Sequence, residues 1–298
     1  MNDTARRIAF LGTGLMGTPM VRRLLHAGFD VTVWNRDRTK ADALLEDGAV
    51  VADTAAEAVK GACVVFLMLS DGKAVSDVLF SQGVAPALEA GAVVIDSSSI
   101  APEAARVHAA RLAEQGIRHV DAPVSGGVVG AAAGTLAIMA GGDAAVVEEL
   151  IGVFAPLGRV THVGPSGTGQ LAKLGNQQIV AVTIGAIAEA MMLVEAGGGS
   201  REAFRRAIRG GFAESRILDI HGQRMVERNF GHAGPSKLQL KDLNNILAEA
   251  ERLSLTLPLT EVVRTEFAAF VEGGGGEIDH SGLLLHLEEK NARSQKQP

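Results

Sequence analysis

The sequence is poor in cysteine and has no long run of basic residues. Cys63 is the only cysteine among 298 residues, so the chain can form neither an internal disulfide nor a metal site built from thiolates. The formal net charge of −6, with no basic stripe, argues against binding to a phosphate backbone. We therefore expect a protein of a reducing, cytoplasmic setting that does not bind nucleic acid.

The sequence also lacks a recognisable targeting segment. Residues 1–7 are polar and lead directly into a strand-like run, whereas a secretory signal combines a basic start, an apolar stretch and a cleavage site. Elsewhere, charge or glycine interrupts the apolar stretches before the ~20 residues that a membrane-spanning helix needs. With 47% hydrophobic and 21% charged residues, the composition is that of a packed globular protein. We expect it to be soluble, with no membrane partner.

Short β-branched runs alternate with amphipathic stretches from residue 8 to about residue 163. This alternation is typical of repeated βαβ units around a buried parallel sheet. The predicted strands are Ile8–Leu11, Val31–Trp34, Val50–Ala52, Cys63–Leu69, Val93–Asp96, Arg118–Asp121, Leu136–Met139 and Val160–Val163. The predicted helices between them are Met16–Ala27, Thr39–Glu46, Lys73–Phe80, Pro102–Glu114 and Asp143–Phe154. The fold class is therefore predicted to be α/β, with a doubly wound, mostly parallel, Rossmann-like sheet.

Helical periodicity dominates after Gly164, where strand-like runs of that quality cease. We therefore predict a dinucleotide-binding domain over residues 1–164 and an all-α substrate and dimerisation domain over residues 165–298. The segment Thr168–Ala196 contains no proline. At ~1.5 Å per residue it can form one helix of about 40 Å that joins the two domains.

The segment Ile8–Gly17 carries a GxGxxG pattern between a predicted strand and a predicted helix. In this context Gly12 permits a tight turn, Gly14 lets the backbone approach a pyrophosphate, and Gly17 allows close packing of helix and strand. The alternative is a glycine-rich turn that binds no ligand. The predicted cofactor-binding residues of the turn are Gly12, Thr13, Gly14, Leu15, Met16 and Gly17.

The second predicted strand ends in Asn35 and Arg36, where an NAD-dependent enzyme usually has an acidic residue. An arginine can pair with the 2′-phosphate of NADP, and Asn35 lacks the carboxylate that would repel it. Thr39 can add a hydrogen bond. These residues predict NADP as the preferred cofactor, while NAD stays possible because Arg36 can also be a solvated loop charge.

Further strand ends supply more candidate contacts. Met68, Leu69 and Ser99 follow predicted strands at the sheet edge that faces the nicotinamide half of a dinucleotide, although Ser99 can instead cap the next helix. Ser125, Gly126 and Gly127 follow the strand that ends at Asp121. Their hydroxyl and backbone N–H groups predict a cradle for a substrate carboxylate, and a plain turn is the alternative.

The helix that begins near Thr168 has polar residues on one otherwise apolar face. Asn176 and Gln177 lie three and four residues after Lys173, which is the spacing of neighbours on one face of a helix. We expect a polar site here, with Gln177 among the substrate contacts. A lone helical lysine is more often solvated, which is the alternative for Lys173.

Several segments together resemble the β-hydroxyacid dehydrogenase family, which includes 3-hydroxyisobutyrate dehydrogenase-like proteins. They occur in the order of the family and cover nearly the whole chain. The segments are the glycine turn with Met16, DAPVSGG from Asp121 to Gly127, GTLAIMAGG from Gly134 to Gly142, the GxGxxxKxxN pattern of residues 167–176, and Lys241-Asp242-Leu243. Asn176-Gln177 and residues 210–215, GGFAES, most resemble the branch that reduces tartronate semialdehyde.

The resemblance implies an oxidoreductase that moves a hydride between NADP(H) and a small β-hydroxyacid and semialdehyde pair. The favoured reaction is the reduction of tartronate semialdehyde (2-hydroxy-3-oxopropionate) to glycerate. Alternatives are a 3-hydroxyisobutyrate dehydrogenase and a glyoxylate or succinic semialdehyde reductase. An alternative of another class is a dinucleotide-binding scaffold without catalysis, since a fold does not by itself specify a function.

The resemblance also implies roles for individual residues. Lys173 is implied as the catalytic lysine, and Asn176 as a group that orients the lysine or the substrate. Ser125, with the two glycines after it, is implied to contact the substrate carboxylate, and Lys241 to close over cofactor and substrate. The helical domain is implied to form the interface of a homodimer or homotetramer. We expect no metal, because no histidine or carboxylate spacing near this site has a ligand pattern.

Overall fold

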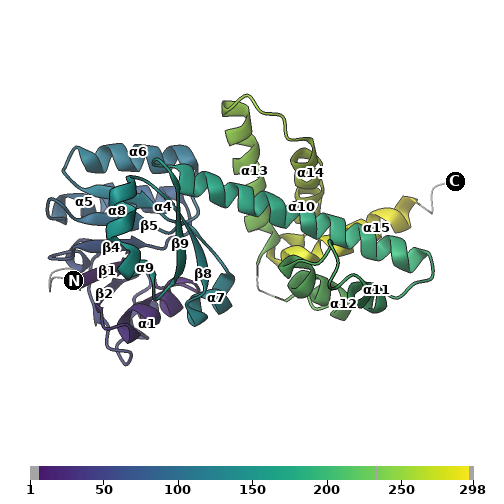
Figure 1. Ribbon diagram of the computed structural model, residues 1–298, viewed down its shortest axis with the longest axis horizontal. Helices are drawn as coiled ribbons and strands as arrows, with labels where there is room; N and C mark the ends of the chain where they lie inside the picture. The colour runs from purple at the N-terminus through teal and green to yellow at the C-terminus, as the bar shows by residue number, and fades with distance from the viewer. Residues whose placement is uncertain (1–6, 232–233, 295–298) are drawn as a thin grey trace. The chain divides into compact units, whose positions relative to one another are not determined.

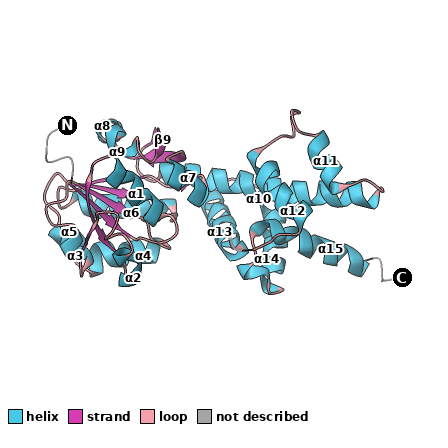
Figure 2. Ribbon diagram, turned by 90° about the horizontal axis from the view of Figure 1, so that it is seen from below, coloured by secondary structure: helices cyan, strands magenta, loops and turns pink. Residues whose placement is uncertain are grey.

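The computed structural model describes residues 7–231 and 234–294 and divides into two compact units, Met1–Lys173 and Leu174–Pro298. The first unit combines strands and helices, and the second is helical (Figure 2). The long helix α10 begins in the first unit and continues into the second, so this division falls inside a helix. The functional domain boundary at residue 164 stays a prediction.

A nine-stranded sheet forms the centre of the first unit. Its order is β3-β2-β1-β4-β5-β6-β8-β7, with β9 paired to β8. Pairing is parallel from β3 through β6, and β8 runs antiparallel to β6 and β7. The strands are β1 Arg7–Leu11, β2 Asp30–Trp34, β3 Val50–Val51, β4 Val64–Leu67, β5 Val93–Asp96, β6 Arg118–Asp121, β7 Val124–Ser125, β8 Leu136–Gly141 and β9 Gly158–Gly164. The predicted doubly wound, mostly parallel sheet is confirmed.

Helices cover both faces of this sheet (Figure 1). Alternate residues of a strand point to opposite faces, and accordingly Ile8 and Phe10 pack in one apolar cluster while Ala9 and Leu11 pack in another. The first cluster includes residues of α1, α8 and α9, and the second includes residues of α3, α4 and α6. The helices are α1 Gly17–His26, α2 Arg38–Asp42, α3 Ala55–Ala58, α4 Gly72–Ser76, α5 Val84–Ala87, α6 Pro102–Ala113, α7 Gly127–Ala133, α8 Ala144–Glu149 and α9 Ile151–Phe154.

The local predictions differ from the structure where the elements are short. The predicted helix Lys73–Phe80 becomes α4 followed by a π-helical turn, Asp77–Ser81. The predicted helix Asp143–Phe154 is divided at Leu150 into α8 and α9. Strand β7 and helix α7 were not predicted, since the sequence indicated only a carboxylate cradle at residues 125–127, with a plain turn as the alternative.

The strand order places a switch point between β1 and β4. The chain continues from β1 to β2 on one side and from β4 to β5 on the other. In doubly wound sheets, ligands bind at the carboxyl ends of the strands beside such a point. Residues that follow Leu11 and Leu67 are therefore the first candidates for a site.

The helical unit packs around the middle of α10. Ile184, Met191, Leu243, Phe267 and Leu284 are among its buried apolar residues. The helices are α10 Thr168–Ala196, α11 Arg201–Ala207, α12 Gln223–Glu227, α13 Ser236–Arg252, α14 Pro258–Glu272 and α15 Leu283–Ser294. The predicted helix Thr168–Ala196 is confirmed with the same bounds.

Helix α10 departs from the expectation that no segment has the length and composition of a membrane span. Within residues 7–231 and 234–294 it is the one helix that is long and apolar enough to cross a membrane. Glycines at 175 and 185 do not interrupt it. Its apolar character has a packing explanation in the structure, because Ala181, Ile184, Ala188 and Met191 are buried in the core of the helical unit.

Candidate active site

The turn between β1 and α1 has the shape that its glycines permit. Gly12 has φ +108°, a conformation that only glycine adopts readily. A Cβ atom on Gly12 would lie 2.3 Å from the Met68 carbonyl oxygen, and one on Gly17 would lie 1.9 Å from the Gly12 carbonyl oxygen. Gly14 is different, because a Cβ there would meet no described atom within 4 Å. Tight packing behind the turn and open space beside Gly14 fit the approach of a dinucleotide pyrophosphate.

Asn35 holds this turn in place. Its Oδ1 accepts a hydrogen bond from the Thr13 N–H at 3.1 Å, and its Nδ2 donates to the Asp37 carbonyl oxygen at 2.9 Å. The Gly12 N–H donates to the Trp34 carbonyl oxygen at 2.8 Å. The end of β2 is therefore joined to the glycine turn. Sequence reasoning considered only that Asn35 has no negative charge, and it did not predict the hydrogen bond between Asn35 and the glycine turn.

Charged side chains cluster beyond the end of β2. The Thr39 hydroxyl donates to Asp37 Oδ1 at 2.7 Å, a hydrogen bond that lowers the pKa of the Asp37 carboxyl. Arg38 forms ion pairs with Asp42 and Asp53. Arg36 is exposed and makes no ion pair in the part of the chain that the structure describes. Of these groups, Arg36 is the guanidinium available to an incoming phosphate.

The ends of β4 and β5 are joined by Ser98. The Ser98 hydroxyl accepts the Leu69 N–H at 2.9 Å, and the Met68 N–H donates to the Leu11 carbonyl oxygen at 2.9 Å. These bonds bring the predicted contacts Met68 and Leu69 next to the glycine turn. Ser99, for which capping was the alternative to a cofactor contact, is not the N-cap of α6, because Ala101 holds that position. Ser99 is half-buried.

The predicted carboxylate cradle lies in β7 and at the start of α7. Ser125 pairs with Ala137 of β8 and is half-buried. Gly126 and Gly127 follow it with φ values of +138° and +64°, and both are exposed. Ser125 thus belongs to a short strand and not to a plain turn, which was the alternative to the predicted cradle, and the two glycines reverse the chain into α7.

A buried carboxylate holds the first turn of α10. Asp121, at the end of β6, is fully buried, and its Oδ1 and Oδ2 accept the N–H groups of Gly167 at 2.7 Å and Gln170 at 2.9 Å. Burial raises the pKa of Asp121 to about 6, although the backbone N–H groups act in the opposite direction. Burial also raises the pKa of Asp96, its register partner on β5, to about 7. Lys173 follows Gln170 by one helical turn.

The other predicted polar residues of α10 connect to α13 within the helical unit. Asn176 Nδ2 donates to Gln177 Oε1 at 2.9 Å, and Gln177 Nε2 donates to Asp242 Oδ2 at 2.8 Å. Lys241 Nζ lies 3.4 Å from Asp242 Oδ1. The structure therefore brings Asn176, Gln177 and Lys241 together. Sequence reasoning missed Asp242 as the partner that Gln177 and Lys241 share, although it follows Lys241 directly.

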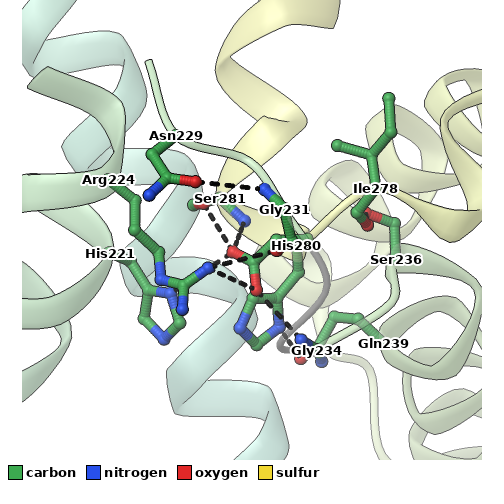
Figure 3. A network of polar contacts seen from close by, with 11 residues as sticks. His221, Arg224, Asn229, Gly231, Gly234, Ser236, Gln239, Ile278, His280 and Ser281 are labelled. Atoms are coloured by element: carbon green, nitrogen blue, oxygen red, sulfur yellow. Dashed lines mark hydrogen bonds and ion pairs between the residues drawn. The ribbon is translucent and has the colours of Figure 1, made fainter. Parts of the chain in front are cut away.

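A second polar network lies in the helical unit around Asp279. This carboxylate is fully buried and accepts the N–H groups of Gly234 and Ser281, both at 3.0 Å, with Arg224 Nη1 at 3.5 Å (Figure 3). Burial acts to raise the pKa of Asp279, but the nearby His221 ring and the hydrogen bonds from Ser281 outweigh it, and the pKa lies far below its usual value. The network joins the segment after α12 to the segment before α15.

Two histidines complete this network. The ligand-type atoms of His221, Asp279 and His280 lie within 4.8 Å of one another, a grouping that metal sites also have. Here Arg224 already neutralises the carboxylate. Burial lowers the pKa of His280 to about 4, so this ring is neutral at pH 7. We treat the cluster as a structural network, and the prediction that the chain uses no metal stays a prediction.

Comparison with protein families covers almost the whole chain. A family model described as the NAD binding domain of 6-phosphogluconate dehydrogenase matches residues 7–164. A second, described as the NAD-binding domain of NADP-dependent 3-hydroxyisobutyrate dehydrogenase, matches residues 167–287. The first match contains the glycine turn and the whole sheet, and the second contains α10 and the helices that pack around it.

Individual relatives agree on the architecture and differ in substrate. The chain is 41% identical to 2-hydroxy-3-oxopropionate reductase of Escherichia coli, over 95% of this chain and 97% of that protein. It is 34% identical to the NAD-dependent L-serine dehydrogenase of Pseudomonas aeruginosa, over 93% and 96% of the two chains. A solved structure of Mycobacterium tuberculosis 3-hydroxyisobutyrate dehydrogenase with L-serine matches with a TM-score of 0.88 and 33% identity, over 95% and 99%.

Proposed function

Since the chain belongs to the β-hydroxyacid dehydrogenase family and is an NAD(P)-dependent oxidoreductase, we propose that it reduces tartronate semialdehyde to glycerate with NADPH. The substrate assignment is supported by 41% identity to a 2-hydroxy-3-oxopropionate reductase and by the Asn176-Gln177 pair. The cofactor assignment is supported by Arg36, which stands exposed just beyond the end of β2.

One observation carries the catalytic part of this proposal. The first turn of α10 is hydrogen-bonded to Asp121 at the end of β6 and, through Gln170, to the segment after β5. These strands end at the same edge of the parallel sheet as β1, where the glycine turn lies. Lys173 is therefore carried by the segment of α10 that is attached to the cofactor edge of the sheet.

Lys173 acts as the general acid in this mechanism. The bound cofactor supplies the hydride that the carbonyl carbon of the substrate receives. As negative charge develops on the carbonyl oxygen, the Lys173 ammonium stabilises it and donates a proton, and the amine takes the proton back in the reverse reaction. General acid–base catalysis of this kind contributes about 10²- to 10⁴-fold in rate.

Ser125, Gly126 and Gly127 hold the substrate carboxylate in this proposal. The two glycines expose backbone N–H groups at a chain reversal, which are suitable donors to a carboxylate. Asn176 and Gln177 provide amide groups to the remaining polar atoms of the substrate, and Asp242 fixes the orientation of the Gln177 amide. Lys241, beside Asp242, adds a positive charge that attracts the two anionic ligands, the cofactor and the substrate.

A substrate panel tests the reaction directly. Purified protein is assayed with tartronate semialdehyde, succinic semialdehyde, glyoxylate and methylmalonate semialdehyde, each with NADPH and NADH, and in the oxidative direction with L-serine and 3-hydroxyisobutyrate. We expect the highest kcat/KM for tartronate semialdehyde with NADPH. A higher value for L-serine or 3-hydroxyisobutyrate with NAD would overturn both the substrate and the cofactor assignment.

Lys173→Ala tests the catalytic residue. We expect kcat to fall about 10²- to 10⁴-fold, while NADPH still binds, because the glycine turn and Arg36 do not depend on the lysine. Lys60→Ala removes an exposed lysine of the same unit and is the control for the loss of one positive charge. Near-normal turnover in Lys173→Ala would refute the role of this residue, whereas the scaffold alternative requires that the wild type shows no turnover with any substrate of the panel.

We also propose that the protein is a cytoplasmic homodimer or homotetramer whose subunits associate through the helical domain, residues 165–298. Exposed apolar side chains on this part of the chain, among them Leu193, Phe212 and Leu259, support an interface. Light scattering of the purified protein measures the oligomeric state. A monomer at micromolar concentration would contradict the proposal.

A further inference from the structure

The start of α10 is attached to the sheet by an unusual set of buried polar contacts. Asp121 accepts two backbone N–H groups at the beginning of this helix, from Gly167 and Gln170. The first N–H groups of a helix have no partner within the helix, and a negative charge at this end is favourable. Asp121 thus supplies, from β6, the partners that the helix itself cannot provide.

Two glycines allow the helix to approach the sheet this closely. A Cβ atom on Gly169 would lie 2.3 Å from the Asp121 carbonyl oxygen and 2.4 Å from the Met139 carbonyl oxygen. A Cβ on Gly141, in β8, would lie 2.6 Å from the Gly169 nitrogen and 2.7 Å from Asp121 Oδ1. The backbone of the first turn of α10 therefore lies directly against the ends of β6 and β8, and the Asp121 carboxylate fits into the same contact.

Gln170 attaches the same turn to the segment after β5. Its side chain is 1% exposed, its Nε2 donates to the Ser98 carbonyl oxygen at 2.7 Å, and its Oε1 accepts the Ile100 N–H at 3.1 Å. Both polar atoms of the amide are therefore engaged with backbone 70 and 72 residues earlier in the chain. Ser98 in turn holds the residues at the end of β4.

Lys173 is the residue that this attachment controls most directly. It lies three residues after Gln170, on a neighbouring position of the same helix face and about 4.5 Å further along the axis. From this geometry, and resting on the proposed function, we infer that Asp121 and Gln170 are positioning residues for Lys173. They fix the first turn of α10 against the sheet, and so fix the base of the lysine side chain at the edge where the cofactor binds.

Gln170→Leu is the main test. Leucine has a similar size but leaves the Ser98 carbonyl and the Ile100 N–H without their partner, so the turn is free to shift. We expect kcat to fall about tenfold to a hundredfold, the scale of a misplacement near 1 Å. The dissociation constant of NADPH should stay within about twofold, because no residue of the glycine turn is altered. Gln170→Asn, which shortens the reach to Ser98 and Ile100, and Asp121→Asn, which weakens the separate attachment of the same turn to β6, should also reduce kcat.

A double-mutant cycle separates positioning from general destabilisation. If Gln170 acts through Lys173, then Gln170→Leu in the Lys173→Ala background should lower the residual kcat by no more than about twofold, since coupled residues are not additive. Leu79→Ala, a change in the apolar core of the same unit, is the stability control. It should lower the unfolding midpoint without a selective loss of kcat.

Each outcome has a definite meaning. A full additional loss of kcat in the Lys173→Ala background, or near-normal kcat in Gln170→Leu, overturns the positioning role. Loss of kcat in Leu79→Ala equal to that in Gln170→Leu also overturns it. Failure of the proposed function gives a different result from failure of the positioning role, because the Lys173→Ala variant alone would then retain its turnover. If Gln170→Leu does not fold, Gln170→Asn and Asp121→Asn carry the same test.

Discussion

Asp96 makes the stability of the first unit depend on pH in a direction opposite to that of most carboxylates. The side chain is fully buried at the end of β5, where Oδ1 accepts the Ser98 N–H at 2.9 Å. Oδ2 has no hydrogen-bond partner among the described residues. Burial, with a smaller contribution from the charge of Asp121, raises the pKa of Asp96 from 3.8 to about 7, against the opposing effect of hydrogen bonds from Ser98.

The sign of the effect follows from proton binding. In the unfolded chain the Asp96 carboxyl loses its proton near pH 4, whereas in the folded protein it keeps the proton until about pH 7. Between these values the folded state binds more protons, so the free energy of unfolding falls as pH rises. Three pKa units at about 1.4 kcal/mol each amount to about 4 kcal/mol, of which about 3 kcal/mol develops between pH 5 and 8.

Asp96→Asn removes this dependence while keeping the shape of the side chain. The amide retains an oxygen for the Ser98 N–H, but its new N–H₂ group has no acceptor, at a cost of about 1–3 kcal/mol that is independent of pH. We therefore expect the variant to be equal to or less stable than the wild type at pH 5 and more stable at pH 8.

The assay uses the single tryptophan of the chain. Trp34 lies in β2, so its fluorescence during urea denaturation reports on the first unit. The free energies of unfolding of wild type and Asp96→Asn are compared between pH 5 and 8, with Glu114→Gln as an exposed control of the same charge change. A difference between wild type and variant that stays constant over this range would refute the buried, protonated carboxyl.

Three further substitutions test other parts of the structure. Gly17→Ala should abolish NADPH binding in a fluorescence titration, because the methyl group would lie 1.9 Å from a carbonyl oxygen of the same turn; unchanged affinity would contradict the tight turn. Arg36→Ala should raise the KM for NADPH about tenfold with little change for NADH, whereas Arg38→Ala, whose guanidinium is already paired, should have a smaller effect. Equal effects of the two would contradict the assignment of Arg36. Asp279→Ala should destabilise the helical unit by about 3–5 kcal/mol, because Arg224 loses its buried partner. Helix content followed by circular dichroism during denaturation measures this, and an unchanged midpoint would show that the network adds no stability.

The positions of several strands and of the long helix were predictable because their signals are local. Runs such as Val93–Asp96 and Arg118–Asp121 have the composition of buried strands, and the structure has strands with these bounds. Helix α10 likewise begins and ends where its sequence predicts. In each case the information needed, apolar periodicity and the absence of proline, lies within the segment itself.

The short elements were less predictable. Strand β7 consists of Val124 and Ser125 alone, and its pairing with β8 exists only because the chain returns at residues 136–141. Two residues are too few for a period of two to be seen. Helix α7, GVVGAAA, contains glycine that is unfavourable in a helix, so local propensity did not predict it.

A residue of the candidate site was predictable where the backbone geometry requires its residue type. It was not predictable where the requirement comes from a hydrogen-bond partner far away in the sequence. Gly12 and Gly17 are recognisable because no other residue fits the turn that they form. Gln170 and Asp121 are different, since a glutamine on a helix or an aspartate after a strand is usually solvated. Their partners are backbone groups between 46 and 72 residues away.

This difference explains which functional residues cannot be recognised from a single sequence. A buried polar side chain is tolerated only when its hydrogen bonds are satisfied, and for Gln170 and Asp121 those bonds join the end of β6 and the segment after β5 to the first turn of α10. These contacts hold the helix of Lys173 at the sheet edge, and through Ser98 they continue to the end of β4, next to the glycine turn. We propose that Lys173 acts only from one position at this edge. Its activity should therefore depend strongly on Asp121 and Gln170, although the sequence gives little sign of their role.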